Sequence, residues 1–325
     1  MISRRRFVAA ATIGAFALPI AGRAQQPLKE ARIGVFAGKP DIAFRDAFVS
    51  ALRVLGWVEG RNLAIDWRPV AHPDEISAHA ADLARLRPHV IVTAGPRISQ
   101  AMAKVTSEIP IVFLAVGDPE KIGLVRSLPR PGGNVTGLRT VAGEGFAGKL
   151  IELLREASPR VTRIGVFNVT GNSMHQLLVE RAKTFESKLR VSVVVLGVQD
   201  EKDIEPAFDR ATRERVDALI VPGDVIVSNN RDRIVALALR HRMPTMFSFS
   251  YYADAGGLLA YGVDVGSLYR DAARLADKIL RGARPQDIPV EQPTRFELVI
   301  NLKTARALGL AIPQTVLLRA DRVIE

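Results

Sequence analysis

The sequence predicts an α/β protein built from two doubly wound, parallel-sheet lobes. The main observation is a repeat, because the segment RIGVF occurs at residues 32–36 and again at residues 163–167. Both copies are then followed by the same order of six further elements, alternately helix and strand. A chain of 325 residues, 48% of them hydrophobic, is long and apolar enough for two packed cores.

Each expected element follows from its residue pattern. Short runs rich in β-branched residues indicate buried strands, and longer runs with apolar residues every three or four positions indicate helices. After the first repeat we expect helix 44–57, strand 62–67, helix 76–87, strand 90–95, helix 98–107 and strand 111–118. After the second repeat we expect helix 174–190, strand 191–198, helix 204–215, strand 218–224, helix 229–242 and strand 245–250. Strands and helices that alternate in this way form parallel sheets covered by helices on both faces.

The last part of the chain is expected to complete both lobes. It contains a strand-like run at 255–262, a helix at 267–282, a proline-spaced segment at 285–293, and a strand and helix at 296–309. These elements complete both sheets if the chain crosses between the lobes near residues 138–140, 261–264 and 293–296. The predicted lobes are therefore residues 28–140 plus 263–294 and residues 141–262 plus 295–325, joined by a three-crossover hinge.

Residues 1–24 have the pattern of an export signal. Arginines at 4–6 precede an apolar stretch over 7–20, and the small residues Gly22 and Ala24 suit cleavage before Gln25. The arginine cluster resembles a twin-arginine signal, although the general secretion route uses the same features. The chain has no cysteine, and therefore no disulfide and no lipid-acceptor residue. We expect an unanchored protein in the periplasm.

The charge distribution argues against nucleic-acid binding. Residues 1–24 carry four arginines and no acidic residue, so their removal lowers the formal charge from +11 to +7. The remaining basic residues alternate with acidic ones, and few aromatic side chains stand between them. A nucleic-acid interface needs a basic stripe, usually with stacking side chains. We expect an ordinary, mildly basic surface.

Four stretches carry a resemblance to a known family. They are GWVEGRNLAIDWR at 56–68, the segment 109–138 around LAVGDPEKIGLVRSLPRPGGNVTGL, the segment 279–310, and the ending LLRADRVIE. The sequence resembles the ABC-transporter substrate-binding proteins of the periplasmic type I, "Venus flytrap" class, in the branch with tryptophan- and tyrosine-associated binding proteins. The resemblance implies a small solute held between two lobes, delivery to a membrane permease, and neither catalysis nor a cofactor. We expect a monomer.

Candidate ligand residues lie where strands end, because ligands of open parallel sheets bind outside the carboxyl ends of the strands. Gly95 allows close approach of the backbone, and Pro96 suits the first helical position. Relatives commonly have a threonine or serine directly after the glycine, whereas this chain has Pro96-Arg97. Arg97 either offers a partner for a carboxylate or faces solvent. Asp118 either holds a ligand amine or caps the turn before Pro119. The first-lobe candidates are Gly38, Gly95, Pro96, Arg97, Ser99 and Asp118.

The second lobe offers a matching set at its strand ends. Asp224 follows a buried strand at the start of a helix, where a carboxylate could anchor an ammonium group. Tyr251 could cover an apolar ligand face, or it could pack in the core. The second-lobe candidates are Asn172, Ser173, Asp224, Ser250 and Tyr251. Capping of helices is the alternative role for Asn172, Ser173 and Asp224.

The sequence also leaves two other classes of protein as alternatives. GEGFAGK at 143–149 has the three glycines of a dinucleotide-binding loop, which raises the alternative of an exported nucleotide-binding oxidoreductase. Leu150 stands where a phosphate loop has a hydroxyl residue, and the following strand RIGVFNV ends without an acidic residue. A periplasmic sensor that shares the fold is the other alternative. The five histidines show no metal-ligand spacing, so no metal is expected.

Overall fold

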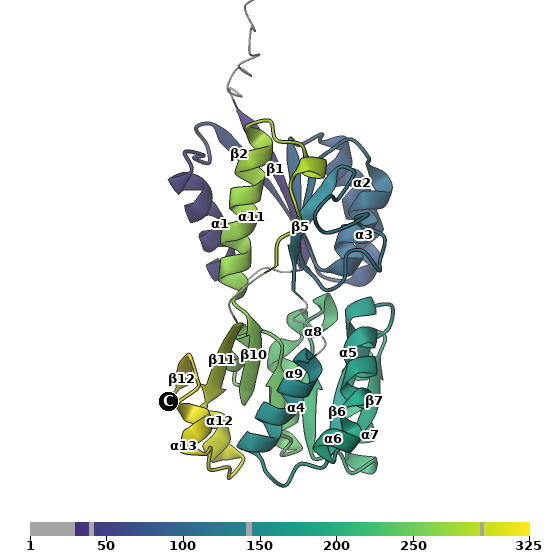
Figure 1. Cartoon of the computed structure of the whole chain (residues 1–325), viewed down its shortest axis with the longest axis vertical. Coiled ribbons are helices and arrows are strands. Elements are labelled where there is room, and N and C mark those ends of the chain that lie inside the picture. The colour runs from purple at the N-terminus through teal and green to yellow at the C-terminus, as the bar shows by residue number, and fades with distance from the viewer. Residues whose placement is uncertain (1–29, 39–41, 141–144, 293–295) are drawn as a thin grey trace, which may run out of the picture.

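The computed structural model describes residues 30–38, 42–140, 145–292 and 296–325. Two α/β lobes, each with its own sheet, are stacked along the long axis of the molecule (Figure 1). Three features expected from the sequence lie outside the described residues, namely the export signal, Gly143 with Glu144, and the 293–295 part of the third crossover. No helix in the described ranges is long and apolar enough to cross a membrane.

The upper lobe in Figure 1 contains a five-stranded, wholly parallel sheet in the order β2-β1-β3-β4-β5. Its strands are β1 (Ala31–Gly38), β2 (Leu63–Val70), β3 (Val90–Ala94), β4 (Ile111–Val116) and β5 (Val135–Arg139). Its helices are α1 (Ile42–Val54), α2 (Ile76–Arg85), α3 (Pro96–Val105) and α11 (Val265–Leu280). Successive side chains of a strand point to opposite faces, so β1 places Ile33 and Val35 against α1 and α11, and Phe36 against α2 and α3.

The lower lobe contains a seven-stranded sheet in the order β12-β11-β10-β9-β8-β6-β7. Its strands are β6 (Arg163–Val169), β7 (Ser192–Val198), β8 (Ala218–Val221), β9 (Thr245–Phe247), β10 (Leu259–Val263), β11 (Phe296–Asn301) and β12 (Arg322–Ile324). Its longer helices are α4 (Phe146–Ala157), α5 (Ser173–Thr184), α7 (Ile204–Arg213) and α9 (Arg231–Arg240). Its shorter helices are α6 (Glu186–Leu189), α8 (Val225–Asn229), α10 (Tyr251–Asp254), α12 (Leu302–Ala307) and α13 (Gln314–Leu317).

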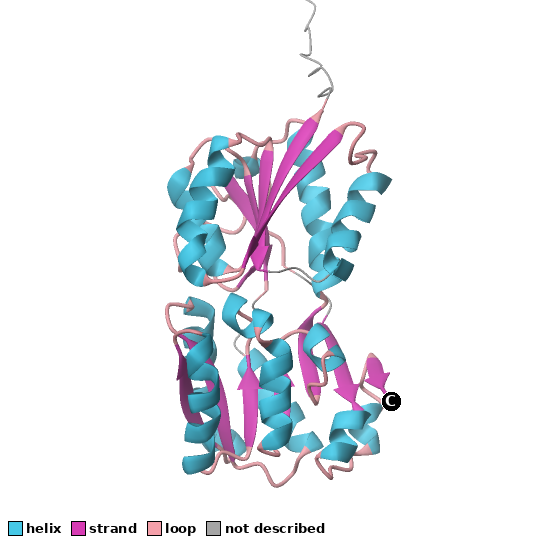
Figure 2. Ribbon diagram, turned by 180° about the vertical axis from the view of Figure 1, so that it is seen from behind, coloured by secondary structure: helices cyan, strands magenta, loops and turns pink. Residues whose placement is uncertain are grey.

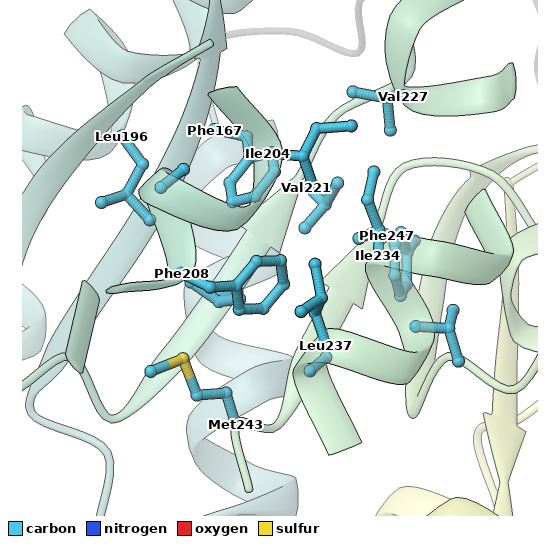
Figure 3. Packing of buried hydrophobic residues seen from close by; sticks show 14 of the residues in the cluster. Phe167, Leu196, Ile204, Phe208, Val221, Val227, Ile234, Leu237, Met243 and Phe247 are labelled. Carbon is cyan, nitrogen blue, oxygen red and sulfur yellow. The ribbon is translucent and has the colours of Figure 1, made fainter. Parts of the chain in front are cut away.

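Helices cover both faces of this sheet (Figure 2), and the core on one face is rich in aromatic side chains. The rings of Phe167 on β6 and Phe208 on α7 meet edge to face, with centroids 5.7 Å apart. Phe247 at the end of β9 belongs to the same cluster (Figure 3). Close-packed aromatic pairs of this kind make each lobe rigid by itself.

The repeated RIGVF segment forms the equivalent inner strand of each sheet. β1 pairs with β2 and β3, and β6 pairs with β7 and β8. The glycine of each copy admits a large neighbour, since a Cβ on Gly34 would lie 2.8 Å from the side chain of Leu83, and one on Gly165 would lie 2.7 Å from that of Leu196. The repeat therefore reflects two lobes built to the same plan.

Two passages of the chain between the lobes lie within the described residues. The chain leaves the upper lobe after Arg139, and it returns between β10 and α11. The expectation of wholly parallel sheets is corrected at one place, because β11 runs antiparallel to β10. β10 leads towards the upper lobe and β11 leads away from it, so adjacent positions in one sheet require opposite directions. The helix expected over 174–190 is also divided, into α5 and α6.

We predict that Gly137→Ala lowers the stability of the protein by about 2–4 kcal/mol, measured by urea unfolding. A Cβ at this position on β5 would lie only 2.0 Å from the backbone oxygen of Phe113, so the strand would have to move. Gly197→Ala is the matched control, since Gly197 also lies on a strand and nothing stands within 4 Å of its Cβ position. Equal effects of the two substitutions would show that the β4–β5 contact is not tight.

Candidate binding cleft between the lobes

The carboxyl ends of strands from both sheets face one cleft, which has two compartments. The α3 compartment has a volume of about 130 Å³ and lies between β1, β3 and α3 of the upper lobe and α8 of the lower lobe. The β5 compartment has a volume of about 280 Å³ and lies between the end of β5 and helices α4 and α5. Met174, Gly223 and Phe249 line both compartments, so they form the partition between them. A Cβ on Gly223 would lie 2.2 Å from the Phe249 ring.

The α3 compartment is lined by two arginines and one carboxylate, with Arg97 on the upper lobe and Arg231 and Asp224 on the lower lobe. Gly95 caps α3 with φ of 86°, a backbone conformation that favours glycine, and Pro96 begins the helix. Arg97 therefore stands in the first turn, half-buried, and its side chain has no hydrogen bond or ion pair to any described residue. On the other lobe, Asp224 accepts hydrogen bonds from Asn172 Nδ2 at 2.7 Å and from the Ile226 amide at 2.9 Å.

Aromatic rings also line this compartment, and the Arg231 guanidinium lies over one of them, 5.9 Å from the centre of the Tyr251 ring. The ring of Tyr251 meets that of Phe44 from α1 at 5.3 Å and stacks on Phe249 at 5.9 Å. Phe44 also stacks on Tyr269 from α11 at 5.9 Å. Burial raises the pKa of the Tyr251 and Tyr269 phenols, so both stay neutral. An apolar ligand group would find a ready surface here.

The two lobes touch each other across the cleft. Asn229 on α8 donates hydrogen bonds to the backbone oxygens of Val70 and Ala71, at 3.1 and 2.8 Å. Lys121 of the upper lobe lies 4.0 Å from the carboxylate of Glu180 on α5. Val225 comes within 3.7 Å of where a Cβ on Gly38 would be, so the glycine permits this approach. The structure is therefore a closed arrangement of the lobes.

The structure brings most of the predicted site residues together. Seven line the α3 compartment: Gly38, Gly95, Pro96, Arg97, Asn172, Asp224 and Tyr251. Asn172 and Asp224 also cap α5 and α8, so their two proposed roles coexist. Asp118 lines the β5 compartment, and its Oδ1 caps the following turn by accepting the Lys121 amide at 3.0 Å.

Three predicted residues line neither compartment, and we correct those predictions. Ser99 is completely buried, and its hydroxyl bonds to Thr93 Oγ1 at 2.8 Å and to the Gly95 oxygen at 2.7 Å. Ser173 is the first residue of α5 and lies outside the cleft lining. Ser250 is buried beside α10, and its backbone carbonyl oxygen accepts a hydrogen bond from the Ala253 amide. All three residues follow a strand by a few positions, and the structure buries Ser99 and Ser250 within their lobes.

Several cleft residues were not predicted from the sequence. They are Phe44, Met174, Ser228, Arg231, Phe249 and Tyr269 in the α3 compartment, and Lys121 and Arg139 in the β5 compartment. Most of them stand in the first or second turn of a helix, whereas the predictions concentrated on the last residues of strands. A search that included the first two helical turns after each strand would have found Phe44 and Met174.

His175 joins the end of β6 to the segment before α8, on the lower-lobe side of the cleft. It is completely buried, its Nδ1 accepts the Val169 amide at 3.0 Å, and its Nε2 lies 3.1 Å from the Gly223 oxygen. Nε2 therefore carries the proton and donates to Gly223. Burial lowers the pKa of the imidazole below its ordinary value of 6.5, and Arg97 lowers it further, whereas Asp224 and the Gly223 carbonyl oppose the shift.

The dinucleotide alternative gains no support from the described part of the GEGFAGK segment. Gly145 precedes α4 as its cap, and α4 leads into β6, which ends at Val169 without an acidic residue. No group of three potential metal ligands is found within the described ranges.

Two α/β lobes with a closed cleft between their strand ends define a two-lobed solute-binding protein. The family model for "ABC transporter substrate binding protein" matches residues 36–324, and the chain belongs to this family. A curated relative, the tyrosine-binding protein of Clostridioides difficile (strain R20291), is 27% identical over 267 residues, which cover 82% of this chain and 76% of the relative. The family is one of substrate-binding proteins of ABC transporters, and the name of this relative describes a binding protein.

Solved structures give the same result. A conserved domain protein from Vibrio cholerae superposes with a TM-score of 0.84 at 28% identity, covering 91% of this chain and 100% of that one. A Streptococcus pneumoniae ABC domain in complex with L-Trp gives 0.83 at 26% identity, with 91% and 100% coverage. A ligand-free, open substrate-binding protein from Clostridium difficile gives 0.64 at 26% identity, with 90% and 99% coverage. The lower score against the open form agrees with the closed cleft described above.

We predict that lowering the pH from about 7.5 to about 5 destabilises the protein in part through His175. The unfolded chain binds the imidazole proton more tightly than the folded chain does, so this stability is present above about pH 6.5 and declines as the pH falls. The difference in melting temperature between wild type and His175→Gln should therefore shrink towards pH 5. His89→Gln, at an exposed histidine of the upper lobe, serves as the control. A constant difference would contradict the burial of a neutral His175.

Proposed function

We propose that this protein captures a free α-amino acid with an apolar or aromatic side chain in the α3 compartment and presents it, in the closed form, to the permease of an ABC importer. The observation that supports this ligand is that Arg97, which has no hydrogen bond or ion pair to a described residue, and Asp224 line the same compartment from opposite lobes. An α-amino acid carries a carboxylate and an ammonium group on one carbon, and the two side chains offer one partner for each.

The shape of the compartment supports the same ligand class. A volume of about 130 Å³ is close to that of an apolar cavity of roughly 150 Å³ that binds benzene, so the compartment admits an aryl or branched alkyl side chain. The rings of Phe44, Tyr251 and Tyr269 would receive an apolar side chain. The tyrosine named for one relative and the L-Trp bound to another are ligands of this class.

Ligand binding is coupled to closure of the two lobes. The ligand touches Arg97 on one lobe and Asp224 on the other, so it binds the closed form more tightly than the open one and shifts the population towards closure. The contacts of Asn229 with Val70 and Ala71 then complete the closed surface.

The cellular setting is part of the proposal. The pattern of residues 1–24 supports export, and the family is typically periplasmic or extracellular. We propose that the mature protein is a periplasmic monomer without a lipid anchor, which needs no nucleic acid and no metal or other cofactor.

We predict that calorimetric titration of the mature protein with the standard amino acids finds at least one apolar or aromatic member that binds in the micromolar range or tighter. Asp224→Asn and Arg97→Gln should each weaken that ligand by about tenfold to a hundredfold, because each removes one charge-assisted contact. Asp209→Asn, at an exposed residue of α7, should bind normally. The amino-acid proposal fails if no amino acid binds, or if Asp224→Asn binds as tightly as Asp209→Asn.

A further inference from the structure

We propose that the β5 compartment is a second binding site, for a carboxylate carried on an apolar body, with Arg139 as its anchor. The site is separate from the Arg97–Asp224 pair and does not depend on the amino-acid ligand proposed above. Three observations support the inference. They are the volume of the compartment, its apolar wall, and the Arg139 side chain, which has no hydrogen bond or ion pair to a described residue.

The compartment is the roomier part of the cleft. Its volume of about 280 Å³ is about twice that of the α3 compartment. At roughly 30 Å³ per water molecule, this volume corresponds to about nine waters, against about four in the α3 compartment. Its lining comes from both lobes, so an occupant would also favour the closed form.

The wall of the compartment is mostly apolar and well packed. Phe146 at the start of α4 and Phe296 at the start of β11 lie 5.9 Å apart, and both pack against Tyr261 on β10, at 6.0 and 5.8 Å. Leu177 on α5 and Val263 on β10 extend this surface. An aryl or branched alkyl group would bury its surface here without displacing polar contacts.

One arginine beside this wall, Arg139, has no carboxylate partner among the described residues. Among the described residues that line the compartment, the cationic side chains are Lys121, Arg139 and Arg181, and the carboxylate is that of Asp118. Asp118 already accepts the Lys121 amide, and the Lys121 ammonium lies 4.0 Å from Glu180. The half-buried Arg139 has no side-chain hydrogen bond or ion pair to a described residue, and its buried Nε has no partner.

The Arg139 guanidinium, which has no partner among the described residues, would be stabilised by a bound anion. Burial of a charged donor without an acceptor is unfavourable, and a carboxylate matches the planar fork of arginine with two parallel hydrogen bonds. The backbone of Arg139 is fixed, since its amide donates to the Glu291 oxygen at 3.0 Å and β5 pairs with β4. The fork is therefore presented from a rigid strand end.

The test uses a pair of probes that differ only in charge, phenylacetate and phenylacetamide, titrated into the mature protein at constant ionic strength. Phenylacetate should bind at least tenfold more tightly than phenylacetamide. Arg139→Gln should lose at least tenfold in affinity for phenylacetate, and Arg139→Lys should retain part of it. Arg160→Gln, at an exposed arginine of the lower lobe, should bind phenylacetate as the wild type does, and Arg97→Gln reports whether the probe uses the α3 compartment instead.

A competition experiment then separates the two sites. With the α3 compartment saturated by its amino acid, phenylacetate should still bind at one molecule per chain. The inference is overturned if phenylacetate does not bind, if binding depends on Arg97 and not on Arg139, or if the amino acid displaces it. Loss of amino-acid binding with Arg139-dependent phenylacetate binding intact would instead count against the function proposed for the α3 compartment alone.

Discussion

The passages of the chain between the lobes are the constraint on which the rest of the structure depends. The chain leaves the upper lobe after β5, returns between β10 and α11, and joins the lower sheet again at β11. Because of these passages the carboxyl ends of the strands in both sheets point at one gap, where side chains from two separate cores meet. The same constraint makes β11 antiparallel to its neighbour. Two rigid cores linked in this way can rotate against each other, but they cannot separate.

The electrostatics of the cleft follow from this arrangement. Each lobe can fold with its own charges at the rim, where water solvates them in the open form. Closure brings Arg97 and Asp224 to the same compartment and removes water from both. Asp224 keeps two protein hydrogen bonds after closure, whereas Arg97 has none to a described residue. In the closed form, the charged groups that lack a hydrogen-bond partner among the described residues are therefore arginines, Arg97 in the α3 compartment and Arg139 in the β5 compartment.

The sequence predicted the architecture well, because strand and helix patterns depend on local residue types. The RIGVF repeat identified equivalent strands, and the rule that ligands bind at strand ends located Gly95, Arg97 and Asp224. The direction of β11 was not predictable from local pattern, because it depends on where the chain returns from the other lobe. Ser99 and Phe44 show the same limit on a smaller scale, since which way a side chain faces is decided by packing between distant segments.

The partition between the compartments has a consequence for how such a protein diversifies. The ring of Phe249 occupies the space that a side chain at position 223 would need. A single methyl group there would push the ring aside and divide the same total volume differently, without touching any charged group. Ligand size and ligand charge are thus set by separate residues. A lineage of such proteins would be able to change the length of the molecule it carries while keeping the recognition of its charged end.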